Sequence, residues 1–352
     1  MKEVVFSDHY KISIPLIQGG MGVGISLGNL AGHVALNGGM GVISTAHPGY
    51  REDDFEVNTL NANVRALKKE IKKAKDIAQS HGMVAVNAMV AIKDYDEMIQ
   101  ASLEAGIDAI ISGAGLPLRL PQLVEGHDVM IAPIVSSGKA CRLVLRSWNK
   151  KYHRCADFVV IEGSEAGGHL GFKKDALLNH TVQPLDQIFL EVKEVVKEFE
   201  AVFNKHIPIF VAGGIYTKED IQKYLALGVD GVQMATRFIT TYECDASDLY
   251  KQMFINAKKE DIELVTSPVG MPGRAIKNKL TETIKTQKIP VKKCYQCLVP
   301  CDVKTTPYCI SKALIEACKG NIDEGLIFSG SNGYRSDKLV SVKDLIAELM
   351  GD

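Results

Sequence analysis

The alternation of strand and helix patterns constrains the fold more than any other feature of this sequence. Short apolar, β-branched runs alternate with longer segments of helical periodicity, and the pair recurs eight times. Strands are expected at 14–18, 41–44, 83–87, 109–112, 130–135, 158–162, 207–212 and 231–235, with helices such as 27–36, 61–80, 95–104, 138–150, 186–203 and 218–227. Eight successive βα units predict an α/β fold, the (β/α)8 TIM barrel; a doubly wound open sheet is the alternative that strand counting leaves open.

The segments that follow the expected strands are rich in glycine and polar residues. They are 18–22, 87–89, 112–115, 136–138, 162–171, 212–214 and 233–237. Active sites of barrels of this type lie at the C-terminal ends of the strands. We therefore expect these segments to form one broad cup lined with backbone amides.

The segment 162–171, Glu-Gly-Ser-Glu-Ala-Gly-Gly-His-Leu-Gly, follows the apolar run 157–161. A side-chain-poor turn of this kind brings backbone N–H groups close to a ligand. His169 is its one side chain that exchanges a proton near neutral pH. We interpret the segment as a cofactor and catalysis loop; a surface histidine in an ordinary turn is the alternative.

The turns at 212–215 and 233–237 correspond to the usual phosphate site of such barrels, after strands seven and eight. Thr217 is a plausible helix N-cap, so helix N-terminal amides are expected to hold a phosphate, with added charge from Arg237. Glycines that only pack at strand ends are the alternative. The segment 20–24, Gly-Met-Gly-Val-Gly, lacks the third glycine of a dinucleotide fingerprint at the right offset, and the sequence contains no Walker A motif.

Five motifs in this order resemble the nitronate monooxygenase (2-nitropropane dioxygenase) family, which includes the FMN-dependent enoyl-ACP reductase of the second type. They are Gln-Gly-Gly-Met-Gly at 18–22, Glu-Ala-Gly-Gly-His at 165–169, Ala-Gly-Gly-Ile at 212–215, Gln-Met-Ala-Thr-Arg-Phe at 233–238 and Gly-Arg-Ala-Ile-Lys-Asn at 273–278. The resemblance covers most of residues 10–280.

The resemblance implies noncovalent FMN in a (β/α)8 barrel, with His169 as the catalytic base or acid. It implies cofactor contacts from Gly20, Met21, Gly22, Asn87, Glu162, Gly167, Gly168, Gly213, Gly214, Gln233, Met234, Ala235 and Thr236. Two positions depart from the family pattern. Ala235 stands where glycine is usual, and Glu162 stands where glutamine is frequent, which would change the electronics of the flavin.

A cysteine-containing C-terminal extension, 281–352, is expected to pack on an FMN-binding barrel domain, 1–280. Cys294, Cys297, Cys301 and Cys309 are separated by three, four and eight positions, which predicts a tetrathiolate site for zinc or a [4Fe–4S] cluster. The spacing loosely resembles that of barrel-fold reductases of the dienoyl-CoA reductase type. Reduced cysteines without a metal are the alternative.

Two enzymatic functions are open at this point. The resemblance favours oxidation of alkyl nitronates with oxygen; the alternative is an enoyl-ACP, or other enoyl thioester, reductase that uses NAD(P)H. An iron–sulfur cluster would favour the reductase. A flavin-binding sensor or assembly module is the non-enzymatic alternative, and His169, which a binding module would not need, argues against it.

The net charge of −1 over 352 residues gives no support to nucleic-acid or anionic-membrane binding. No apolar stretch is long enough for a membrane span, and the N-terminus lacks a signal-peptide core, so we expect a cytoplasmic protein that acts on small molecules. A homodimer is considered alongside a monomer.

Overall fold

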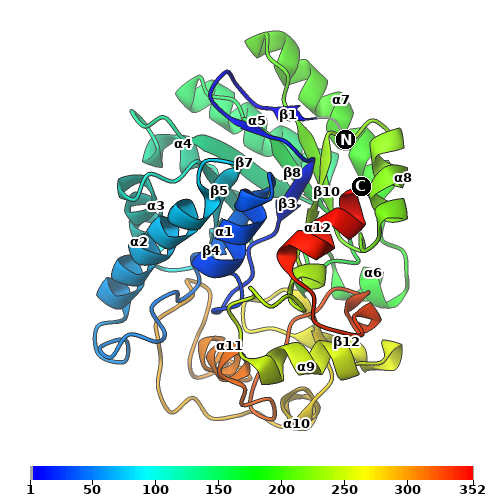
Figure 1. Ribbon diagram of the computed structural model, residues 1–352. Coiled ribbons are helices and arrows are strands. Elements are labelled where there is room, and N and C mark those ends of the chain that lie inside the picture. Colours follow the sequence, from blue (N-terminus) through cyan, green and yellow to red (C-terminus); the bar gives the residue numbers. More distant parts are fainter. Residues whose placement is uncertain (1–2, 352) are drawn as a thin grey trace.

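The computed structural model describes residues 3–351, and its centre is a closed barrel of eight parallel strands (Figure 1). The strands are β3 (Leu16–Gln18), β4 (Met40–Ser44), β5 (Met83–Met89), β6 (Ala109–Gly113), β7 (Met130–Val135), β8 (Val159–Glu162), β10 (Ile209–Ala212) and β11 (Gly231–Met234). The ring closes where β11 pairs in parallel with β3, with Val232 opposite Leu16. The predicted (β/α)8 barrel is confirmed, and the open doubly wound sheet is wrong.

Helices surround the strands and shield their outer side chains from water. They are α1 (Gly28–Leu36), α2 (Thr59–Ala78), α3 (Tyr95–Glu104), α4 (Leu120–Leu123), α5 (Gly138–Tyr152), α7 (Leu185–Phe203) and α8 (Lys218–Ala226). The last helix of the chain, α12 (Val342–Met350), contacts both α1 and α8. The helical layer is therefore completed by a segment that follows the barrel strands by more than a hundred residues in sequence, while the domain boundary at residue 280 stays a prediction.

Strand side chains alternate between two cores, as the period of two in a β-strand requires. On β4, Met40 and Val42 belong to the core inside the barrel, whereas Ile43 belongs to the outer core between strands and helices. The short hairpin of β1 (Val4–Val5) and β2 (Lys11–Ile12) adds Phe6, whose ring lies 5.2 Å from that of Phe158. Apolar packing thus fills this part of the barrel.

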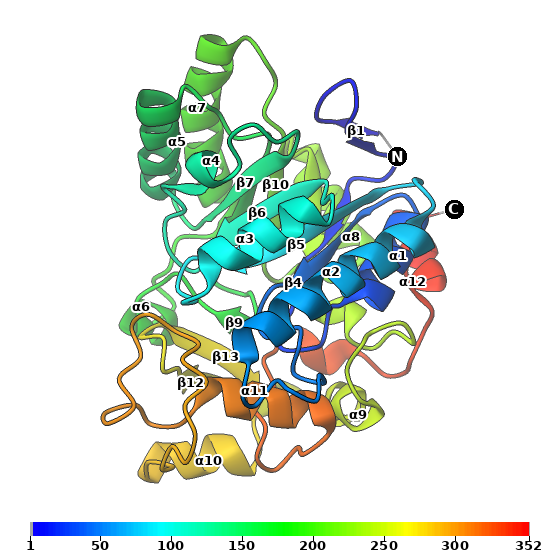
Figure 2. The ribbon, with the colours of Figure 1, turned by 90° about the vertical axis from the view of Figure 1, so that its left-hand side faces the viewer.

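A long insertion between β11 and α12 lies at the opposite end of the barrel from the N-terminal hairpin (Figure 2). It contains α9 (Asp248–Asn256), β12 (Ile262–Thr266), β13 (Pro272–Ile276), α10 (Lys279–Thr286) and α11 (Ile310–Lys319). β12 and β13 form a three-stranded antiparallel sheet with β9 (Gly168–His169), in which Gly273 pairs with His169. The loop after β8 is thereby joined to the insertion.

Candidate active site

A cavity of about 1260 Å³ opens at the C-terminal ends of the barrel strands. His169 and all thirteen residues predicted to contact a cofactor line this one cavity, together with residues of the insertion and of α6 (Lys174–Leu178). The structure therefore brings the whole predicted set together. The individual contacts with a cofactor stay predictions.

The His169 imidazole is fixed by two neighbours from the insertion. Its Nε2 lies 2.7 Å from the Ser267 hydroxyl oxygen, and its ring meets the Phe328 ring edge to face at 5.0 Å between centroids. Burial lowers the pKa of His169 to about 4, because the enclosed site disfavours the charged form. At neutral pH the imidazole is therefore uncharged, which suits a proton acceptor.

Arg274 of β13 holds the loop that carries His169. Its Nη1 donates hydrogen bonds to the carbonyl oxygens of Ser164, at 2.7 Å, and Ala166, at 2.6 Å. Burial lowers the pKa of the guanidinium, which still stays far above neutral because an arginine loses its proton only in strong base. Sequence reasoning quoted the motif at 273–278 without giving Arg274 a role; its place among five ordered motifs was the available signal.

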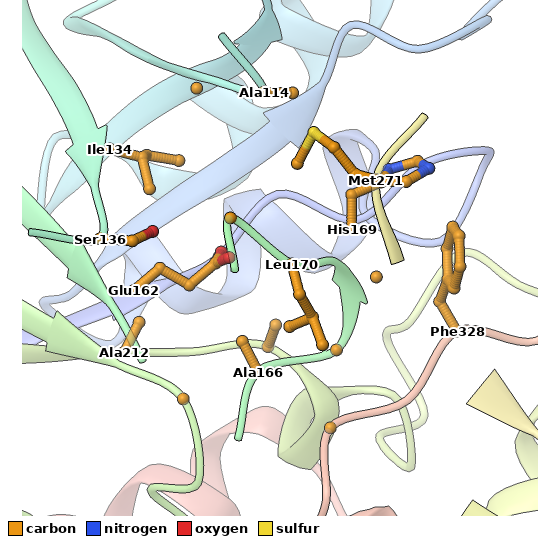
Figure 3. A pocket seen from close by; sticks show the side chains of 18 of the residues that line it. Ala114, Ile134, Ser136, Glu162, Ala166, His169, Leu170, Ala212, Met271 and Phe328 are labelled. Carbon is orange, nitrogen blue, oxygen red and sulfur yellow. The ribbon is translucent and has the colours of Figure 1, made fainter. Parts of the chain in front are cut away.

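Glu162 is the last residue of β8, opposite Ala212 of β10. Figure 3 shows its side chain directed toward the middle of the cavity. Burial raises the pKa of this carboxyl to about 8, and no neighbouring charge contributes to the shift. Near pH 7 the group is therefore mainly a neutral carboxylic acid.

Several cavity glycines are required by the close approach of neighbouring segments. A Cβ on Gly22 would lie 2.8 Å from both the Ser44 hydroxyl oxygen and the Ala46 Cβ, and one on Gly167 would lie 2.5 Å from the Gly330 nitrogen. Gly213 has a φ of +100°, a conformation that L side chains rarely adopt. These glycines therefore pack the loops tightly, which leaves backbone rather than side chains around the cavity.

The floor of the cavity contains an acceptor without a partner. Among the described residues, the buried Oε1 of Gln233 accepts no hydrogen bond. A buried polar atom without a partner is costly, and native structures rarely leave one unsatisfied. Gln233 therefore fits a ligand that brings a hydrogen-bond donor to this point.

Two groups expected at the phosphate end of the site have partners within the chain. The carboxylate of Asp220 accepts hydrogen bonds from the backbone N–H groups of Tyr216 and Thr217, both at 2.9 Å, so these two amides, which precede the first residue of α8, are already occupied. Arg237 turns away from the cavity, and its Nη2 lies 3.2 Å from both carboxylate oxygens of Glu348 on α12. The Nη2 of Arg237 is therefore paired within the chain, whereas among the described residues its buried Nε has no hydrogen-bond partner.

The loop 330–332 lies at this end of the cavity instead. The Gly330 N–H donates to the Thr236 hydroxyl at 2.9 Å, and the Asn332 side-chain amide donates to the Gly214 carbonyl at 2.7 Å. The sequence analysis gave this loop no place in the site. Nothing in a single sequence links it to turns about a hundred residues earlier.

The predicted metal site is not supported by the structure. Cys294 is exposed, while Cys297, Cys301 and Cys309 are half-buried. Over residues 3–351, no three His, Cys, Asp or Glu side chains are grouped in a way that could hold a metal ion. Backbone contacts position this loop instead. Leu298 forms an isolated antiparallel β-bridge with Ile92, and Cys309 is the N-cap residue of α11.

A closed (β/α)8 barrel with a backbone-lined cavity at the strand ends, a neutral histidine and an enclosed carboxylic acid is typical of an enzyme. The family model "nitronate monooxygenase" matches residues 4–352, and the chain belongs to this family of flavin-dependent oxidoreductases. The family resemblance predicted from the sequence is confirmed.

Curated relatives agree with this family. The chain is 29% identical over 192 residues to a probable nitronate monooxygenase of Staphylococcus saprophyticus, a match that covers 54% of this chain and 50% of that protein. It therefore spans about half the length of that relative. A probable nitronate monooxygenase of Bacillus subtilis is 23% identical over 362 residues, which cover 98% of this chain and 97% of that protein.

Solved structures share the fold. FabK from Thermotoga maritima superposes with a TM-score of 0.72 at 22% identity, covering 96% of this chain and 92% of that one. Nitroalkane oxidase from Streptomyces ansochromogenes gives a TM-score of 0.70 at 18% identity, covering 96% and 95%. In the described part of the chain, no helix has both the length and the apolar character to cross a membrane.

Proposed function

We propose that this chain is an FMN-dependent oxidoreductase that oxidises alkyl nitronates with oxygen. The observation that carries the proposal is the convergence of His169 and the thirteen predicted cofactor residues on one cavity. Membership of the nitronate monooxygenase family and the nearly full-length match to the Bacillus subtilis relative support the same reaction class.

The residues of the cavity fit FMN. Gln233 offers an unsatisfied acceptor at the floor, suited to an N–H group of a flavin ring. Gly214, Thr236 and the loop 330–332 would hold the phosphate end. When bound, FMN supplies the two-electron exchange with the substrate and the reaction with oxygen.

His169 would act on the substrate as a general base. The neutral imidazole accepts the proton from the carbon next to a nitro group: the C–H bond breaks, and its electron pair moves into the C–N bond to give the nitronate. Ser267 holds Nε2 and so fixes the ring's orientation. When the nitronate itself is supplied, the same uncharged ring lies beside it without adding charge.

Enoyl thioester reduction with NAD(P)H is the alternative function. A specific feature favours it, because a reductase must protonate the substrate and Glu162 is mainly protonated at neutral pH. The fold shared with FabK is consistent with this alternative.

Anaerobic spectroscopy separates the two functions. We expect the protein to release FMN on denaturation, and its flavin absorbance to bleach with an alkyl nitronate and to return with oxygen. Bleaching by NAD(P)H alone, followed by reoxidation with an enoyl thioester, would instead establish the reductase. Release of FAD, or failure to bind FMN on reconstitution, would reject the proposal.

A cytoplasmic location and a homodimer stay predictions. Light scattering on the purified protein measures the oligomeric state, and fractionation of the source cells tests the location.

A further inference from the structure

We propose that Glu162 is a second proton-transfer residue of this site, donating the proton that the base His169 cannot supply. The inference rests on the proposed flavin-dependent function and adds an acid to it. It concerns the end of β8, where the carboxyl group points into the cavity (Figure 3).

The surroundings of Glu162 leave its carboxyl group available to a ligand. Ala212, which has no polar side chain, lies opposite it on β10. On the other side, Ser136 follows Val135 at the end of β7 and lines the same cavity, but its hydroxyl makes no hydrogen bond with Glu162. Across the described chain, its carboxyl oxygens make no hydrogen bond, whereas Asp157 and Asp230, which precede strand starts, accept hydrogen bonds from backbone amides. A polar group placed at a cavity wall without a structural partner is suited to act on what fills the cavity.

The other titratable groups around the cavity do not shift the pKa of Glu162, so burial alone determines its protonation. The cavity is also lined by Glu165, His169, Lys173, Lys174, Asp175 and Tyr216. None of them contributes to the raised pKa of Glu162, which is about 8. None contributes to the lowered pKa of His169 either.

Burial in this one cavity therefore gives Glu162 and His169 different roles. Burial disfavours the charged form of each group, so it keeps a proton on the carboxyl and removes one from the imidazole. Two groups with oppositely shifted pKa values in one site are typical of an acid and base pair. His169 accepts protons and Glu162 gives them.

The proton transfer balances without a further reagent. In enoyl thioester reduction, a hydride that NAD(P)H would supply by way of the flavin adds to the β-carbon, and the electron pair of the C=C bond moves to the α-carbon. The O–H bond of Glu162 breaks, its hydrogen bonds to the atom that received the pair, and both electrons of the O–H bond stay on the carboxylate. Water then returns a proton to Glu162.

Infrared titration of the purified protein tests the protonation directly. In the wild type, a band of a protonated carboxyl group should disappear as the pH rises through about 8, and the Glu162→Gln variant should lack it. Asp175→Asn is the matched control, because it also removes one carboxylate from the cavity lining but at an exposed position. It should keep the band. A Glu162 carboxyl already ionised at pH 6 would overturn the proposal.

The pH profile of turnover tests the role. In the wild type, kcat should fall above about pH 8, and in Glu162→Gln it should be lower by about a hundredfold at pH 7, without that fall. Glu162→Asp, which retains an acid, should keep the pH-dependent limb and serves if the glutamine variant misfolds. Normal turnover and an unchanged pH profile in Glu162→Gln would reject the role, whereas a wild type without flavin or turnover would reject the proposed function itself.

Discussion

At the residue scale, one physical cause has opposite effects on two side chains. Burial away from water penalises any charge, so it lowers the pKa of His169 and raises that of Glu162. Sequence reasoning identified both residues but treated His169 as either base or acid and Glu162 as a charge near the flavin. The depth of the site, which decides both protonation states, cannot be inferred from one sequence.

Replacing His169 by alanine should leave FMN bound and reduce turnover by about a hundredfold or more, the usual size for a lost general base. The cofactor should stay because Gln233 and the loops after β10 and β11 are unchanged. Flavin content and kcat are measured on the same sample.

Ser267→Ala is the companion to that variant. It removes the hydroxyl that orients Nε2 but keeps the base, so we expect a smaller loss of kcat than for His169→Ala. An active His169→Ala protein would assign the imidazole to structure instead of chemistry.

Glu162→Gln should also change how stability depends on pH. The pKa of Glu162 rises from 4.5 to about 8 on folding, so between these values the folded state binds more protons than the unfolded state. This group therefore costs stability progressively as the pH rises through that window. The variant should melt at a higher temperature than the wild type at pH 9 and at a similar one near pH 4, as differential scanning calorimetry can measure. An equal difference at both pH values would contradict the shift.

At the element scale, periodicity predicted the barrel well. The strand β7 and the helix α3 have the predicted bounds, and the other barrel strands differ by a few residues at their ends, because backbone pairing with neighbouring strands decides where a strand starts. Prediction was incomplete at the start of α8. Thr217 was recognised as an N-cap, but the prediction did not include Asp220, which completes the capping box and accepts hydrogen bonds from the amides of Tyr216 and Thr217.

The loop that contains the four cysteines shows that sequence spacing alone does not establish a metal site. Intervals of three, four and eight positions permit four thiols to converge but do not require it. The path of the chain is set by the bridge between Ile92 and Leu298, and by α11. These pairings have no signature in the sequence.

Helix α12 should be essential to the stability of the barrel, because it packs against both α1 and α8. Leu345 is fully buried, and Leu345→Ala should lower the free energy of unfolding by about 2–5 kcal/mol. Lys343→Ala, on the exposed face of the same helix, should change it by less than about 0.5 kcal/mol. Urea unfolding measures both, and equal effects would indicate that α12 does not pack on the barrel in solution.

At the scale of the whole molecule, the site is built by two parts of the chain. The barrel supplies Glu162, Gln233 and the glycine turns, whereas the insertion supplies Ser267, Phe328 and the loop 330–332. The β9–β13 pairing connects the two parts through His169. The sequence analysis identified the site residues of the barrel, because they lie at the ends of predicted strands. It assigned the insertion no role in positioning the base.

Arg274→Lys tests this connection. A lysine keeps the charge but not the planar guanidinium that reaches the carbonyls of Ser164 and Ala166, so the loop carrying His169 should lose part of its support. We expect kcat to fall by about tenfold, with FMN retained and the free energy of unfolding lowered by about 1–3 kcal/mol. Lys277→Gln, an exposed change on the same segment, is the control and should alter neither quantity. If Arg274→Lys lowered stability but left kcat unchanged, the insertion would hold the barrel together without positioning the base, so the two measurements together decide whether this contact serves the chemistry.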